Sequence, residues 1–204
     1  MGKAEENKRK KQEALFNTAF ELFSTKGINN TAINDIVEKA GVAKGTFYLY
    51  FKDKYDIRDK LIIRKTTALF GEALKALNNK ETIESFPEQV IFVIDHVIED
   101  LRKDKFLVKM ISKDLSWGVY KKALTQMVEE EDKSLSFYHM FMKGANSGGT
   151  HLGDPEVTLF LIVELVGSTA YSSILLEQPK PIDELKPHLY QSIRKILEVE
   201  QIKE

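Results

Sequence analysis

Apolar residues recur three and four positions apart along most of the chain, which is the spacing of one face of an α-helix. In the first segment this apolar stripe consists of Phe16, Ala19, Phe20 and Phe23. The segment ends at Gly27, a residue suited to the left-handed cap of a helix. The pattern therefore predicts a helix over about residues 8–25. Because strand-like alternation is nearly absent, we expect an all-α fold of about nine helices.

Two short helices are predicted next. Thr31 can cap the first of them through its hydroxyl, and Gly41 ends it after about nine residues. The other begins near Ala43 and closes at Phe51. Two short helices joined by a tight glycine turn form a helix-turn-helix, the motif that places its second helix in the major groove of DNA.

The remainder of the chain keeps the helical pattern. A fourth helix starts at Asp53 and runs to about Asn78, and the glycine-rich stretch 144–155 is a loop by composition. Further helices are predicted over residues 86–101, 106–115, 124–142, 155–177 and 182–200. We expect a small domain over residues 1–53 that contains the helix-turn-helix, and a larger helical domain over residues 54–204.

The third predicted helix has an unusual composition. Gly45 stands inside it, at a cost of about 1 kcal/mol relative to Ala. A glycine there lets another surface approach the backbone closely, and Lys44, Thr46 and Tyr48 offer donors suited to phosphate oxygens and base edges. A helix that only packs into a core does not explain why polar donors flank the glycine.

Residues 12–57 closely resemble the TetR family of bacterial transcriptional regulators, also called AcrR. The resemblance rests on residues at fixed spacing: Phe23, Gly27, Thr31, Ile33, Ile36, Ala40, Gly41, Val42, Gly45, Thr46, Phe47, Tyr48, Tyr50, Phe51 and Lys54. It implies that the third helix enters the major groove and that the starts of the second and fourth helices hold the DNA backbone. It also implies that residues 1–53 are a DNA-binding domain and that residues 54–204 are a ligand-binding and dimerisation domain. The residues expected to contact DNA are Thr31, Lys44, Gly45, Thr46, Tyr48, Tyr50 and Lys54. Ala43 departs from the family, which often has Ser or Thr there, so this helix lacks a side-chain cap.

Composition agrees with a soluble globular protein, with 43% hydrophobic and 30% charged residues. No stretch approaches about 18 uninterrupted apolar residues, and the first residues lack the apolar core of a secretion signal, so we expect a cytoplasmic protein. The absence of cysteine excludes disulfides and thiolate chemistry.

Charge is unevenly divided along the chain. The net charge is −1, yet residues 1–60 carry 12 Lys and Arg against 9 Asp and Glu, a net of +3. The run Lys8-Arg9-Lys10-Lys11 can neutralise DNA phosphates, although a solvated helix start explains it equally well.

Catalytic and metal sites have little support in the sequence. The four histidines, His96, His139, His151 and His188, are scattered without metal-ligand spacing. Lys44-Gly45-Thr46 lacks the preceding glycine and the strand that a phosphate-binding loop requires. We therefore expect no enzyme activity, no metal and no cofactor.

Two expectations concern the second domain. The chain is apolar nearly all round over residues 159–176, which is typical of a helix that meets both a core and a partner, although a fully buried core helix is the alternative. A homodimer also suits a palindromic DNA operator. We therefore expect a ligand-responsive repressor that binds its operator as a dimer. The alternative is a helical small-molecule-binding or protein-docking module that does not bind DNA.

The effector is predicted only in outline. Residues expected at its site are Phe92, His96, Trp117, Phe137, Tyr138, Phe141, Glu164 and Tyr171. Apart from Glu156, Glu164 is the only formal charge between Pro155 and Glu177. It either faces the cavity and favours a cationic or aromatic small-molecule effector, or it is a hydrogen-bonded carboxylate at the dimer face.

Overall fold

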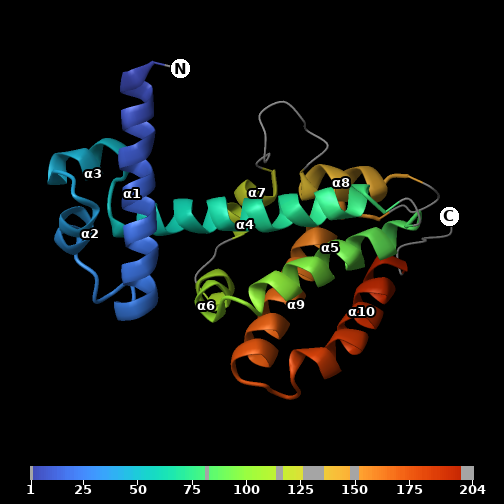
Figure 1. Cartoon of the computed structure of the whole chain (residues 1–204). Helices are drawn as coiled ribbons and strands as arrows, with labels where there is room; N and C mark the ends of the chain where they lie inside the picture. Colours follow the sequence, from blue (N-terminus) through green and yellow to red (C-terminus); the bar gives the residue numbers. More distant parts are fainter. Residues whose placement is uncertain (1, 81–82, 114–116, 126–135, 148–151, 199–204) are drawn as a thin grey trace. The chain divides into compact units, whose positions relative to one another are not determined.

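A computed structural model describes residues 2–80, 83–113, 117–125, 136–147 and 152–198. These residues form ten α-helices and no strand (Figure 1), which confirms the all-α prediction and exceeds its estimate by one helix. The helices are α1 Lys3–Lys26, α2 Ile33–Ala40, α3 Lys44–Tyr50, α4 Lys54–Asn78, α5 Phe86–Leu101, α6 Lys105–Lys113, α7 Trp117–Thr125, α8 Phe137–Gly144, α9 Pro155–Leu175 and α10 Ile182–Glu198.

The chain divides into two compact units, Met1–Arg64 and Lys65–Glu204. The first unit holds α1, α2, α3 and the beginning of α4, and the second holds the rest. The division therefore falls inside α4, ten residues after that helix begins. The assignment of DNA binding to one unit and ligand binding to the other stays a prediction at this point.

An aromatic core holds the first unit together. Three residues of the predicted apolar stripe of α1 are buried there, Phe16, Ala19 and Phe23, whereas Phe20 is only partly buried. The ring of Phe51 lies 5.1 Å from that of Phe16 and 5.4 Å from that of Phe47, which is an ordinary distance for packed aromatic side chains. Since Phe47 lies within α3 and Phe51 directly follows it, this core fixes α3 against α1.

The start of α2 differs from the sequence-based prediction. Its N-terminal cap is Ala32, and the Asp35 carboxylate accepts the Ala32 N–H at 3.4 Å. The Thr31 hydroxyl instead donates to the Gly27 carbonyl at 2.8 Å, so the prediction that Thr31 caps α2 is wrong. At the other end Gly41 has φ +67° and ψ +34°, the left-handed conformation expected of a helix-ending glycine.

The second unit packs around α9, which contacts α6, α8 and α10. α5 lies beside α10 and contributes one continuous buried stripe, whose members are Val90, Ile91, Val93, Ile94, Val97, Ile98 and Leu101. The stripe predicted for residues 86–101 is therefore confirmed as a core face.

One predicted helix, over residues 124–142, is wrong. Ser136 is extended and caps α8, its hydroxyl accepting the His139 N–H, so a separate helix begins at Phe137. The hydroxyl also donates to the Leu124 carbonyl at 2.7 Å. Residues 126–135 of the predicted helix lie outside the described residues, as do 148–151 of the predicted loop and the last one or two residues of the helices predicted over 106–115 and 182–200.

α9 is the one helix, among the described residues, that is long and apolar enough to cross a membrane by length and composition alone. Core helices of soluble proteins pass the same test. Its exposed residues Val157, Leu161, Glu164 and Ser168 are spaced by three and four, so they form one stripe along the helix. This stripe leaves two large apolar side chains half exposed, Val157 at 50% and Leu161 at 52%.

Candidate nucleic-acid interface and effector cavity

α3 presents one buried and one exposed face. Phe47 is completely buried, whereas Tyr48 is 52% and Leu49 78% exposed. Lys44 lies one turn before Tyr48 and Gly45 one turn before Leu49, so these four residues share the exposed face. Leu49 was not among the residues predicted to contact DNA, because an isolated leucine in a sequence cannot be told from a core residue.

Gly45 is not required by the unit that contains it. A Cβ atom built at this position meets no atom of the described chain within 4 Å, and its φ lies outside the left-handed region. Neither packing nor backbone conformation among the described residues therefore demands glycine.

The C-terminal end of α3 is tied to its neighbours by hydrogen bonds. The Tyr50 hydroxyl donates to the Lys8 carbonyl of α1 at 3.4 Å, and the Lys60 ammonium donates to the Tyr50 carbonyl at 2.9 Å. Lys60 also pairs with Asp56 at 3.0 Å. Although partial burial opposes its ionisation, the Lys52 N–H and the Lys60 ammonium lower the pKa of the Asp56 carboxyl below its ordinary value. These contacts hold α3 as a rigid element.

Thr31 and Lys54, expected at the DNA backbone, have partners inside the unit. Thr31 is 1% exposed and its hydroxyl is engaged by carbonyls of α1 and of the turn after it. The Lys54 ammonium donates to the carbonyls of Asn29 at 3.0 Å and Thr31 at 3.3 Å. Lys54 therefore joins the turn before α2 to the start of α4, and Thr31 supports that turn from within.

The basic run at the start of α1 is exposed and partly paired. Lys10 pairs with Glu6 at 2.8 Å, and Arg64 binds both carboxylate oxygens of Glu13, at 2.7 and 3.0 Å. Surface pairs of this kind contribute about 0–1 kcal/mol each. The side chains of Lys8 and Arg9 are exposed beside them.

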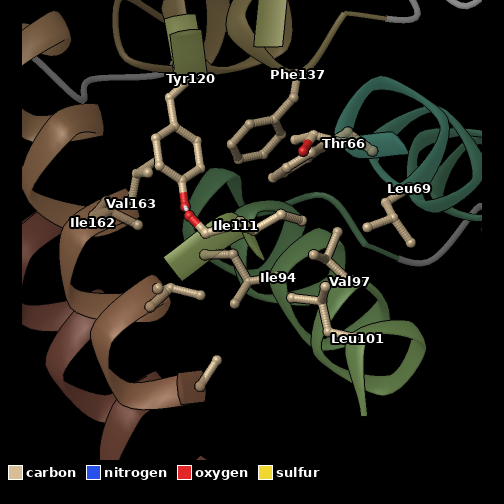
Figure 2. A pocket seen from close by; sticks show the side chains of 14 residues that line it. Thr66, Leu69, Ile94, Val97, Leu101, Ile111, Tyr120, Phe137, Ile162 and Val163 are labelled. Carbon is tan, nitrogen blue, oxygen red and sulfur yellow. Dashed lines mark hydrogen bonds between the residues drawn. The ribbon is translucent and has the colours of Figure 1, made fainter. Parts of the chain in front are cut away.

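The second unit contains a small apolar cavity, with a volume of about 50 Å³, shown in Figure 2. Six helices, α4 to α9, each contribute to its wall. The lining residues are Thr66, Leu69, Phe70, Ile94, Val97, Leu101, Ile111, Tyr120, Phe137, Ile162, Val163, Val166, Gly167 and Ala170. Of the residues predicted at an effector site, Phe137 is in this wall.

Two polar side chains stand in that wall. The Tyr120 hydroxyl donates to the Ile111 carbonyl at 2.8 Å, and burial raises the pKa of Tyr120 well above its ordinary value. Thr66 is 3% exposed, and its hydroxyl oxygen has no hydrogen-bond partner among the residues the structure describes.

Trp117 and Tyr138, two other predicted effector residues, do not line the cavity, and both contact the Glu156 carboxylate. The Trp117 indole N–H and the Tyr138 hydroxyl donate to Glu156 at 3.4 and 3.3 Å, and Lys121 pairs with it at 2.6 Å. The hydrogen bonds to Lys121 and Trp117 lower the pKa of Glu156 below its ordinary value. This cluster joins α7, α8 and α9.

The structure places the remaining predicted effector residues outside the described cavity wall. Phe92 stacks on His96 with ring centres 6.3 Å apart, on α5. Phe141 is buried with its ring 5.3 Å from that of Phe86. Glu164 is exposed on the stripe of α9, and Tyr171, also on α9, is partly buried. Among the described residues no group of three His, Asp or Glu side chains could hold a metal ion.

The polar face of α5 is covered by α10 through ion pairs. The Lys186 ammonium, with a side chain only 14% exposed, pairs with Asp95 at 2.7 Å and also with Glu99. The Tyr190 hydroxyl donates to Asp95 as well. Although burial opposes ionisation, these donors lower the pKa of the Asp95 carboxyl below its ordinary value. This face is thus a helix-helix contact, although its composition is typical of a solvated surface.

Known proteins resemble the chain in sequence and in fold. Residues 15–61 match the family profile described as bacterial regulatory proteins, tetR family. The uncharacterized HTH-type transcriptional regulator YhgD of Bacillus subtilis is 24% identical over 157 residues, which cover 76% of this chain and 80% of that protein.

Two solved structures illustrate the similarity in fold. A TetR-family regulator from Syntrophomonas wolfei superposes with a TM-score of 0.67 and 20% identity, covering 96% of this chain and 99% of the other. The regulator FadR of Bacillus subtilis, solved in complex with stearoyl-CoA, superposes with a TM-score of 0.62 and 20% identity, covering 91% of this chain and 97% of the other.

Three features of the first unit define a helix-turn-helix DNA-binding protein. They are its aromatic core, the glycine turn between α2 and α3, and the exposed face of α3. The matched profile shows that residues 15–61 are similar to the tetR family of bacterial regulatory proteins, and the chain is similar to HTH-type transcriptional regulators over most of its length. It is a DNA-binding regulator and not an enzyme.

Proposed function

We propose that the chain is a cytoplasmic, ligand-responsive repressor, which binds a palindromic DNA operator as a homodimer and leaves it when a small molecule enters the cavity of the second unit. The observation that carries the DNA-binding part is the exposed face of α3. There a glycine that nothing in the described chain requires stands among exposed donors and an exposed leucine.

On this proposal each residue of the exposed α3 face has a role set by its chemistry. Lys44 reaches base edges, because a lysine ammonium suits the guanine acceptors of the major groove. The Tyr48 hydroxyl donates to a phosphate, and Gly45 lets the helix approach the duplex closely. Leu49, 78% exposed, contacts a thymine methyl group, the apolar feature of the same groove.

Other residues of the first unit support this contact. Thr46 and Tyr50 flank the exposed face, and Tyr50 also anchors α3 to α1 through its hydroxyl. Lys54 holds the turn before α2 through its ammonium, and the residue remains partly exposed. Thr31 acts from within, by holding the end of α1 against that turn.

The dimer is proposed to form through α9 and α10. Val157 and Leu161 leave apolar area half exposed on a helix that otherwise packs into the core, and covering such area is favourable. Glu164 lies on the same stripe, which favours its role at the dimer face over a role in the cavity. A two-fold protein also matches a two-fold operator.

Ligand response is proposed to pass through α4. This helix carries Lys54 at its start and three cavity residues, Thr66, Leu69 and Phe70, further along. The cavity holds only a few water-sized spheres, so a larger molecule must displace the helices that enclose it. Displacement of α4 would change the DNA-binding unit, and the fold neighbour solved with stearoyl-CoA supports a ligand-binding role for this architecture.

The proposal is tested with purified protein and the DNA upstream of its own gene. We expect a sequence-specific mobility shift that survives excess unrelated DNA, and a dimer by sedimentation at micromolar concentration. A dimer that shifts no DNA would favour a helical binding module and overturn the proposed function. A monomer that binds specific DNA would overturn the dimer alone.

A further inference from the structure

We propose that the effector of this regulator is an uncharged, largely apolar molecule with one hydrogen-bonding group, which is seated at the Thr66 hydroxyl. The inference rests on the proposed function, since it names the class of molecule that the cavity takes. Three observations carry it: the wall of the cavity, the state of Thr66 and the positions of two carboxylates of α9.

The wall has few groups that could stabilise a charged ligand. Among its described lining residues only Thr66 and Tyr120 have polar side-chain atoms, and none carries a formal charge. Placing an ion in such a site without a partner costs several kcal/mol, because the wall cannot replace its hydration shell. An apolar molecule instead gains from every part of its surface that the wall covers.

Thr66 provides the single polar anchor. Figure 2 shows its hydroxyl among the apolar side chains of the wall, between α4 and the ring of Phe137. The group is 3% exposed and lacks a hydrogen-bond partner within the described chain, a state that costs about 1–3 kcal/mol. A ligand that brings a hydroxyl or a carbonyl to this oxygen removes that cost on binding.

Tyr120 is less able than Thr66 to form a hydrogen bond with a ligand. Its hydroxyl proton is already donated to the Ile111 carbonyl at 2.8 Å, so only its oxygen is left to accept. Thr66 can still both donate and accept. Of the two hydroxyls in the wall, the one without a hydrogen-bond partner among the described residues is therefore that of Thr66.

Two carboxylates of α9, Glu156 and Glu164, are not among the lining residues of the cavity. Glu156 is bound by Lys121, Trp117 and Tyr138. Glu164, the residue on which a cationic effector would depend, is exposed on α9 and is absent from the cavity wall. The Glu164 charge contributes to the raised pKa of the Tyr120 hydroxyl, but Glu164 is not a lining residue and so offers a cation inside the cavity no direct contact.

The test uses three probes with one chain length and different head groups: 1-octanol, octanoate and octylammonium. Isothermal titration calorimetry of the full chain at pH 7 should show 1-octanol binding at least tenfold more tightly than either ion. Equal or tighter binding of octanoate or octylammonium, or no measurable binding of 1-octanol, would overturn the proposal.

Two matched variants separate the role of Thr66 from a general effect on the fold. Thr66→Val keeps the shape and removes the hydroxyl, so it should weaken 1-octanol binding roughly threefold to tenfold. Ser173→Ala removes the other buried hydroxyl without a described partner, which lies outside the cavity wall, and should leave 1-octanol binding unchanged. Equal effects of the two variants, or none from Thr66→Val, would overturn the role of Thr66.

Operator binding by the unmodified protein is measured separately. If the protein binds its operator but does not prefer 1-octanol, the effector class is overturned and the proposed function stands. If 1-octanol is preferred but no operator is bound, the proposed function fails and the ligand class of the cavity stands.

Discussion

Replacing Gly45 by Ala should stabilise the protein and weaken its binding to DNA. The added methyl group meets no atom of the described chain within 4 Å, and the backbone there is not left-handed, so the folded state tolerates it without strain. Alanine is favoured over glycine in a helix by about 0.5–1 kcal/mol. For a chain of 204 residues this raises the melting temperature by about 1–4 °C.

The same methyl group stands where the proposed interface brings α3 closest to the duplex. We expect operator affinity to fall at least tenfold, which corresponds to about 1.4 kcal/mol. Thermal unfolding followed by circular dichroism measures the first effect, and fluorescence anisotropy with a labelled operator the second. A variant that gains stability and keeps wild-type affinity would refute the proposed approach of α3 to DNA. A variant that loses stability would refute the claim that no packing requires Gly45.

Three further predictions follow from other parts of the chain. Lys44→Ala should lower operator affinity by about 1–3 kcal/mol and change sequence preference, whereas Tyr48→Phe should weaken binding to all sequences alike. Binding to a panel of operator variants measures both effects, and a uniform loss for Lys44→Ala would contradict contact between Lys44 and a base. Gly144→Ala puts a Cβ 2.1 Å from the Phe86 ring, so it should lower the free energy of unfolding in urea by about 1–3 kcal/mol and leave operator affinity unchanged. An unchanged free energy of unfolding would contradict the packing of Gly144 against Phe86. The pKa of Asp95 is lowered in the folded state, so its contribution to stability is present above the ordinary pKa near 3.8 and is lost as pH falls below it. The Asp95→Asn variant should therefore be less stable than the wild type at pH 7 and should lose less stability between about pH 5 and pH 2. An unchanged pH profile of stability would contradict the pairing of Asp95 with Lys186.

The DNA-binding unit was largely predictable because its signals are local. Gly41 in the left-handed turn and the aromatic spacing of Phe47 and Phe51 are set by helix geometry within one short segment. The capping of α2 by Thr31 was predicted wrongly, because a threonine before a helix can bond either to that helix or to the end of the preceding one. The choice depends on how the turn folds back on α1.

The second unit was less predictable because its contacts join distant segments. The cap at Ser136 interrupts a continuous apolar pattern, and its hydroxyl bonds to Leu124, twelve residues away. The polar face around Asp95 has the composition of a solvated surface and becomes a helix-helix contact only because Lys186, about ninety residues further on, reaches it. The cavity wall consists mostly of apolar residues whose spacing is the same in a filled core, so nothing in the sequence marks it as hollow.

The measurement that tests the central claim most directly is selection of bound duplexes from a random DNA library, followed by methylation interference on the enriched sequence. The account predicts an enriched sequence with two inverted half-sites, and loss of binding when guanine N7 in the major groove of either half-site is methylated. The Gly45→Ala variant should fail to enrich that sequence. Enrichment of no sequence, or binding that is indifferent to major-groove methylation, would contradict the account.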